Sequence, residues 1–170
     1  QRAIVCACTS CALLMEQPGA ARGRFRAVPD RFLTDPDHHL DDGAWEALQI
    51  PVGVAFFFRN AALDRLVALY PSPAGATESL LPMDSWQDWT EREPRLATVE
   101  PDTEALLIRR HRDRREAFVV PVDACYELVG IIRRHWRGFD GGAEARASIE
   151  QFFDRVRTRS GSFQESTAHA

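Results

Sequence analysis

Two nearly uninterrupted apolar runs lie in the middle of the chain. Residues 51–60 (PVGVAFFFRN) and 63–71 (LDRLVALYP) are both rich in strand-forming side chains, and a short polar connection at residues 60–64 separates them. Two such runs around a short polar turn predict an antiparallel hairpin. Because the first run is apolar at almost every position, it predicts a strand that is buried on both faces in the middle of a sheet.

A second strand pair and two helices are predicted in the C-terminal half. Residues 104–110 (EALLIRR) and 116–121 (EAFVVP) flank the charged turn HRDRR at 111–115. Asp123 is the expected cap of a helix that GFDGG at residues 138–142 ends. Apolar residues fall on one face of this helix and of a final one, at helical spacing: Cys125, Leu128, Val129, Ile132 and Trp136, then Ile149, Phe152, Phe153 and Val156.

Shorter elements are predicted elsewhere. Residues 24–28 alternate polar with apolar and predict a strand that ends at Pro29, and residues 44–49 predict a short helix capped by Asp42. PSPAGATES at residues 71–79 is typical of a turn. Asp84 and Gln87 then have capping-box spacing before a helix that carries Trp86 and Trp89.

The order of elements predicts the fold class. It runs hairpin, helix, hairpin and two helices, without the regular βαβ alternation that calls for a parallel sheet. We therefore expect an α+β fold, a mainly antiparallel sheet packed by C-terminal helices. Residues 1–20 form a small N-terminal cysteine knuckle, 21–159 a single domain and 160–170 a disordered tail.

Composition excludes several function classes. All 21 basic residues are arginine, so the chain has no lysine for a Schiff base or a phosphate-binding loop. A net charge of −4 makes nucleic acid and anionic membranes poor partners. We find no apolar run long enough to cross a bilayer and no signal peptide, and we expect a cytoplasmic protein that has lost a segment before Gln1.

Three of the four cysteines lie within six residues, in CACTSC. Cys8 and Cys11 have the C-x-x-C spacing of a zinc knuckle, in which a tight turn aims both thiolates at one ion. Cys6 lies two residues earlier on an extended stretch and is a candidate third ligand. A structural zinc needs four ligands, and candidates for the fourth are His38, His39, Cys125, a second subunit or the missing N-terminal segment, with Cys125 better explained as a core thiol.

Other interpretations of these cysteines stay open. They are simple reduced thiols, or Cys8 and Cys11 form a redox dithiol, although the thioredoxin-like βαβ context of such sites is absent here. With two further ligands the pair could instead hold iron in a rubredoxin-like electron-transfer site.

Three other features are candidate sites. Gly75, Thr77 and Ser79 could cradle a phosphate between a strand and a helix, in place of an ordinary turn. Such a cradle would make the protein an enzyme that binds a small ligand at residues 71–79, which is a second alternative function. Tyr70 with Trp86 and Trp89 could line a groove, in place of core. A positive patch, or a charged hairpin tip that discourages aggregation, is formed around His111 by Arg109, Arg110, Arg112, Arg114 and Arg115. None of the catalytic motifs G-x-S-x-G, H-E-x-x-H and glycine-rich dinucleotide turn occurs, so the sequence favours a non-enzymatic protein.

Six stretches together resemble an uncharacterised family of actinobacterial-type genomes, whose genes often neighbour those of nickel–iron hydrogenases. They are CACTSCALL, VPDRFL, IPVGVAFFFRN, YPSPAGATESLL, VPVDACYELVGIIRRHWRG and IEQFFDRVR, and the resemblance extends to about Arg159. It implies a second C-x-x-C pair upstream, which would complete a zinc-ribbon or rubredoxin-like site with Cys8 and Cys11. The expected function is that of an accessory protein acting by protein contact, with a hydrogenase component as the expected partner.

Overall fold

The structure is a computed structural model that describes residues 4–17, 19–34, 45–46, 52–79, 94–111, 114–138 and 141–162. The helices are α1 (Thr9–Glu16), α4 (Val122–His135) and α5 (Gly142–Arg159), with short 3-10 helices η1 (Ala20–Gly23) and η2 (Pro94–Thr98). The strands are β1 (Leu33–Thr34), β2 (Val54–Asn60), β3 (Arg65–Ser72), β4 (Gly75–Glu78), β5 (Glu104–His111), β6 (Arg114–Pro121) and β7 (Gly161–Ser162).

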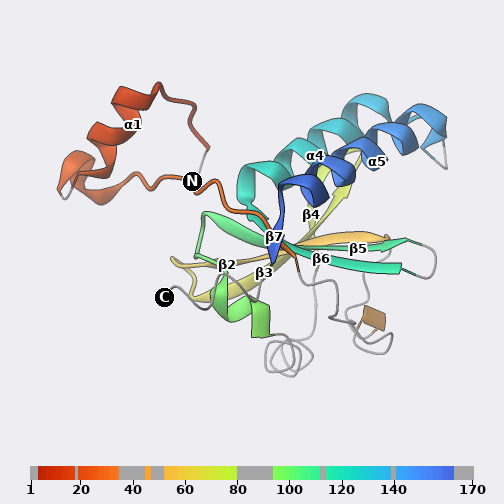
Figure 1. Cartoon of the computed structure of the whole chain (residues 1–170), viewed down its shortest axis with the longest axis horizontal. Coiled ribbons are helices and arrows are strands. Elements are labelled where there is room, and N and C mark those ends of the chain that lie inside the picture. Colours follow the sequence, from red (N-terminus) through yellow and green to blue (C-terminus); the bar gives the residue numbers. More distant parts are fainter. Residues whose placement is uncertain are drawn as a thin grey trace.

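The strands form one sheet in the order β4-β3-β2-β5-β6-β1-β7. Every pairing is antiparallel except that of β1 with β7. Both expected hairpins are present, β2 with β3 and β5 with β6, and β2 pairs with β5 in the middle of the sheet. The α+β class with a mainly antiparallel sheet and C-terminal helices is therefore confirmed (Figure 1).

The sheet is apolar on both faces, as the pattern of β2 predicts. Ala55, Phe56 and Phe57 are completely buried. Because alternate side chains of a strand point to opposite faces, Phe56 joins the cluster under α4 and α5, and Phe57 joins a second cluster with Trp45 and Val99. Each fully buried side chain of this size contributes about 1.5–3 kcal/mol through the hydrophobic effect.

Helices α4 and α5 lie together over one face of the sheet (Figure 1). The predicted apolar stripes are the buried ones: Cys125, Leu128, Val129 and Ile132 in α4, and Phe152, Phe153 and Val156 in α5. One detail was wrong, because the N-cap of α4 is Pro121 and Asp123 lies inside the first turn, where its Oδ1 accepts the Ala124 amide at 3.0 Å. Its negative charge still suits the positive end of the helix dipole.

Two edge predictions need correction. Residues 24–28 are not a strand, because the edge of β6 pairs with Leu33 and Thr34 and leaves the earlier residues without a ladder. There Arg26 instead donates to the carbonyl of Pro101 at 3.0 Å. The expected tail begins with β7, whose Gly161 amide donates to the Phe32 carbonyl at 3.0 Å.

Some predictions lie outside the described residues or only partly inside them. Of the expected helix at 44–49, Trp45 and Glu46 are helical and the rest is outside the described part, as is Asp42. The capping box at Asp84 and Gln87 and the two tryptophans that follow it also lie outside. Among the helices described, none combines the length and the apolar character needed to cross a membrane.

Candidate functional site

The cysteines sit on an N-terminal arm, which we define as residues 4–23. Residues 4–8 have no regular secondary structure, and α1 begins directly after Cys8, whose φ of −71° and ψ of 158° are those of an N-cap. The carbonyl of Cys8 accepts the first helical hydrogen bond, from the Ala12 amide at 2.9 Å. The expected helical turn is therefore present, and it begins earlier than expected, so that the helix includes Cys11.

This backbone geometry brings Cys8 and Cys11 together. The Cys8 side chain makes no capping hydrogen bond to the helix, and the groups that favour its thiolate are the amide and thiol of Cys11 and the Ser10 amide. These donors stabilise the thiolate and hold the pKa of Cys8 below its ordinary value, with the Cys11 amide as the largest cause. Both cysteines are exposed, so their sulfurs are accessible to a metal ion or a reactive molecule.

The other predicted ligands do not join this pair. Cys6 is exposed in the segment before α1, and within the described residues no group of three or more Cys, His, Asp or Glu side chains is arranged to hold a metal. Cys125 is completely buried on the inner face of α4, where desolvation raises the pKa of its thiol, as expected of a core cysteine. His38 and His39 lie outside the described part of the chain.

The pair fits half of a tetrahedral metal site. Two exposed cysteines three residues apart at the start of a helix are the ligand type and the spacing that zinc and iron knuckles use. A closed structural site needs two more ligands, and soft sulfur or imidazole ligands would match the first two.

The stretch at residues 71–79 is not a loop between a strand and a helix. Its turn is only at residues 73–74, and Gly75–Glu78 form the edge strand β4, which pairs with Leu69–Ser72. The Ser72 and Thr77 hydroxyls are 3.2 Å apart, and the Ser79 amide donates to the Ala68 carbonyl at 2.9 Å. These polar groups satisfy each other within a hairpin, and the geometry gives no cradle for the phosphate expected at Gly75, Thr77 and Ser79.

The predicted arginine patch includes one buried residue. Arg109 is only 4% exposed, lies 4.4 Å from the centre of the Phe153 ring and pairs with Glu150 of α5. Alternation along β5 turns it under the helix, while Arg110 is exposed. Arg112 is outside the described residues. Tyr70 packs against the second core cluster, which agrees with the core interpretation.

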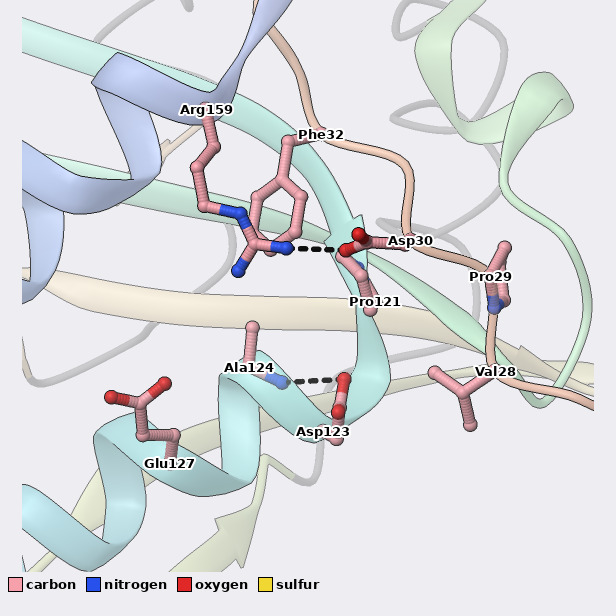
Figure 2. A pocket seen from close by; sticks show the side chains of 9 residues that line it. All are labelled: Val28, Pro29, Asp30, Phe32, Pro121, Asp123, Ala124, Glu127 and Arg159. Atoms are coloured by element: carbon pink, nitrogen blue, oxygen red, sulfur yellow. Dashed lines mark hydrogen bonds and ion pairs between the residues drawn. The ribbon is translucent and has the colours of Figure 1, made fainter. Parts of the chain in front are cut away.

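A hollow of about 320 Å³ opens where the start of α4 faces the chain that follows the arm (Figure 2). Asp123 and Glu127 come from α4, Asp30 from the segment before β1, and Arg159 from the end of α5. Arg159 is paired with Asp30 and lies 4.0 Å from the centre of the Phe32 ring. Two of the three carboxylates already have a cation, Asp30 in Arg159 and Glu127 in Arg155, so the hollow has no strong preference for the charge of a ligand.

No local pattern in the sequence marks this hollow. Its lining comes from segments about 30, 120 and 160 along the chain, which meet because β1 pairs with both β6 and β7. The sequence predicts a tail from residue 160 onward, so it gives no sign of the strand at residues 161–162 that brings these segments together.

One family model matches nearly the whole chain. A family model described as a family of unknown function (DUF5947) matches residues 1–160. No curated protein and no solved structure matches the chain.

Proposed function

This chain belongs to DUF5947, a family of unknown function, and we propose that it is a non-enzymatic accessory protein that binds a metal ion through its arm and acts by contact with another protein. The observation that carries the proposal is the exposed pair of Cys8 and Cys11, held together at the start of a helix. The proposal names zinc as the metal, because a closed thiolate site without redox chemistry suits a structural knuckle.

The surface around the pair supports action by protein contact. Helix α1 buries none of its residues, and Figure 1 shows the arm lying to one side of the sheet. Six of the eight large apolar side chains that are exposed in the described part lie on or next to the arm: Ile4, Val5, Leu13, Leu14, Met15 and Phe25. Apolar side chains concentrated in this way beside a half-complete ligand set favour a surface that a partner covers.

A hydrogenase component is the partner that we propose, and the cytoplasm is the compartment. The support is the sequence resemblance to a family encoded beside nickel–iron hydrogenases, together with three exposed cysteines that a reducing compartment keeps as thiols. In this proposal the body of the protein positions the arm, and the arm delivers or completes a metal site during hydrogenase maturation.

Metal analysis of the reduced protein tests the first part. We expect zinc to be bound, and Cys8→Ser and Cys11→Ser each to abolish binding, because a thiolate is lost from the pair. Cys125→Ser is the matched control and should retain the metal, since this thiol is buried in the core. Cys6→Ser and a His38→Ala/His39→Ala double variant then identify further ligands. A reduced protein that binds no metal would remove the proposal.

Purification from native cells tests the partner. We expect a tagged protein to retain a hydrogenase component, the Cys8→Ser variant to retain less of it, and a deletion strain to lose hydrogenase activity. Normal hydrogenase activity in the deletion strain would exclude this partner. Iron in place of zinc, visible as red colour from thiolate-to-iron charge transfer, would instead support the rubredoxin-like electron-transfer module.

A further inference from the structure

The cysteine pair of the arm supplies only half of a closed zinc site. Cys8 and Cys11 offer two thiolates, and a structural zinc ion takes four ligands. Cys125 is buried in the core, and within the described residues no group of three or more Cys, His, Asp or Glu side chains is arranged to hold a metal. A closed site therefore needs two ligands that this part of one chain does not bring to the pair.

We propose that a second copy of this chain supplies them, so that Cys8 and Cys11 of two chains bind one zinc ion between their arms. The inference rests on the proposed function, because it uses the same metal-binding pair, and it adds the molecule that completes the site. Each copy contributes the same two thiolates, and the resulting set of four cysteines is one of the closed sets of structural zinc. The contact has two-fold symmetry, in which the same patch of both copies meets.

The position of the pair on the arm gives a second arm access to it. Figure 1 shows the arm to one side of the sheet, and α1 buries none of its residues. Cys8 is the N-cap of α1 and Cys11 lies in its first turn, so the pair marks the end of the helix. A second arm can therefore approach this end without displacing any core side chain of the body.

Exposed apolar side chains flank the pair along the chain. Ile4 and Val5 precede it and are 51% and 64% exposed, and Leu13 and Leu14 follow it and are 58% and 67% exposed. A second arm that binds the same ion brings its own copies of these side chains to the contact. Their burial would stabilise the association in addition to the four metal–sulfur bonds.

Charge also favours such a centre. One Zn²⁺ ion with four thiolates has a net charge of about −2, and the positive end of each α1 helix, about +0.5, points toward it. The first turn of α1 contains no acidic residue. Residues 4–26 contain three arginines and one glutamate, so the segments that surround the anionic centre are themselves positive.

The test uses the tagged protein, purified from native cells under reducing conditions and separated from other proteins. Native mass spectrometry counts the chains and the zinc ions in each assembly. We expect two chains with one zinc ion, and single chains after a chelator removes the zinc. Cys8→Ser and Cys11→Ser should each abolish the two-chain assembly, whereas Cys6→Ser should retain the assembly and its zinc ion.

Leu14→Ser tests the apolar part of the contact. The variant retains every thiol, so the two-chain assembly should still form with zinc but should dissociate at a higher chain concentration than the unchanged protein. Leu63→Ser is the matched control, because Leu63 is also exposed, at 58%, but lies in the turn between β2 and β3. This control should leave the assembly unchanged, and equal effects of the two variants would contradict the proposed contact.

The mass and the metal content separate this inference from the proposed function. One zinc ion on a single chain would mean that one chain supplies all the ligands, which overturns the second copy and leaves the metal-binding accessory protein intact. A two-chain assembly that persists without zinc would also overturn the inference. Chains that bind no zinc would remove the metal site itself.

Discussion

Arg109 is a charged residue that the fold uses inside its core. Its guanidinium lies over the Phe153 ring, donates to Glu150 Oε2 at 3.1 Å and lies 3.9 Å from Glu116 Oε2. Glu116 is itself held by Arg157 Nε at 2.6 Å. This network joins β5 and β6 to α5, and the flat guanidinium also supplies packing area between strand and helix.

Arg109→Ala should lower the free energy of unfolding by about 2–3 kcal/mol, because it removes buried packing and leaves two carboxylates without their shared cation. This loss of unfolding free energy is smaller than the loss expected for breaking a fully buried ion pair, since the Glu150 side chain is 45% exposed and can be hydrated. Urea unfolding measures it. Arg155→Ala is the matched control: its pair with Glu127 is exposed on both sides and should contribute less than about 1 kcal/mol. Equal losses for the two variants would contradict a special role of Arg109.

The reactivity of Cys8 should depend on pH differently in the folded and the unfolded chain. Thiolate is the form that reacts with iodoacetamide, and the folded state lowers the pKa of Cys8 through the Cys11 amide and thiol. The alkylation profile of Cys8 should therefore shift to lower pH in the folded protein than in urea. For Cys125 the pKa shift has the opposite sign, because burial raises the pKa of its thiol. Cys125 should therefore react with iodoacetamide only after unfolding. Coincident profiles for Cys8 in the two states would exclude the hydrogen-bonded arrangement.

At the scale of elements, the close approach of β2 and β5 depends on a glycine. A Cβ added at Gly53 would lie 2.7 Å from the Arg110 carbonyl oxygen, and the Gly53 carbonyl accepts the Arg110 amide at 2.7 Å. Both contacts involve backbone, so the strands themselves would have to move apart. The glycine therefore fixes where the central pairing of the sheet begins.

Gly53→Ala should destabilise the protein by about 1–3 kcal/mol, the usual cost of forcing atoms into a packed site. Gly130→Ala is the matched control, because this glycine is exposed in the interior of α4 and a Cβ there meets no atom within 4 Å. That variant should stabilise the protein by about 0.5–1 kcal/mol, through lower chain entropy in the unfolded state. Thermal unfolding of the two variants distinguishes them, and a shift of the same sign in both would count against the close contact.

The sequence correctly predicts the elements whose hydrophobic pattern shows which of their faces are buried. The continuous apolar run of β2 requires cover on both faces, and the stripes of α4 and α5 require one sheet face, so the central place of β2 and the packing of the helices follow from periodicity. The errors lie where pairing is non-local. Leu33 and Thr34 form a strand, rather than residues 24–28, because the available edge of β6 meets them, and no local pattern records that.

The candidate sites divide in the same way. The spacing of Cys8 and Cys11 fixes their proximity, since three residues of one turn bring both sulfurs to the start of α1. The sequence predicts a phosphate cradle at Gly75 and Thr77 because small and polar residues occur both in tight turns and in edge strands. Only their pairing with Tyr70 to Ser72 distinguishes the two cases.

At the scale of the whole molecule, the chain consists of a body with a two-sided core and an arm that contributes nothing to that core. No residue of α1 is buried, whereas β7, only two residues long, lies at the sheet edge next to β1. The core that stabilises the fold and the exposed cysteines thus lie in different parts of the chain. The body holds the fold, and the reactive sulfurs lie on a segment whose changes the fold tolerates.

Two truncations test this division. Removing residues 1–20 should change the free energy of unfolding by less than about 0.5 kcal/mol, because no buried side chain of α1 is lost, while metal binding disappears. Removing the residues from 161 onward is the smaller truncation, yet it should lower the free energy of unfolding by about 1 kcal/mol. The reason is that the Gly161 amide no longer donates to the Phe32 carbonyl and β1 loses its parallel neighbour. Urea denaturation of both chains gives the comparison. A large loss of stability without the arm would mean that the arm packs on the body, and the function proposed for its exposed surface would have to be abandoned.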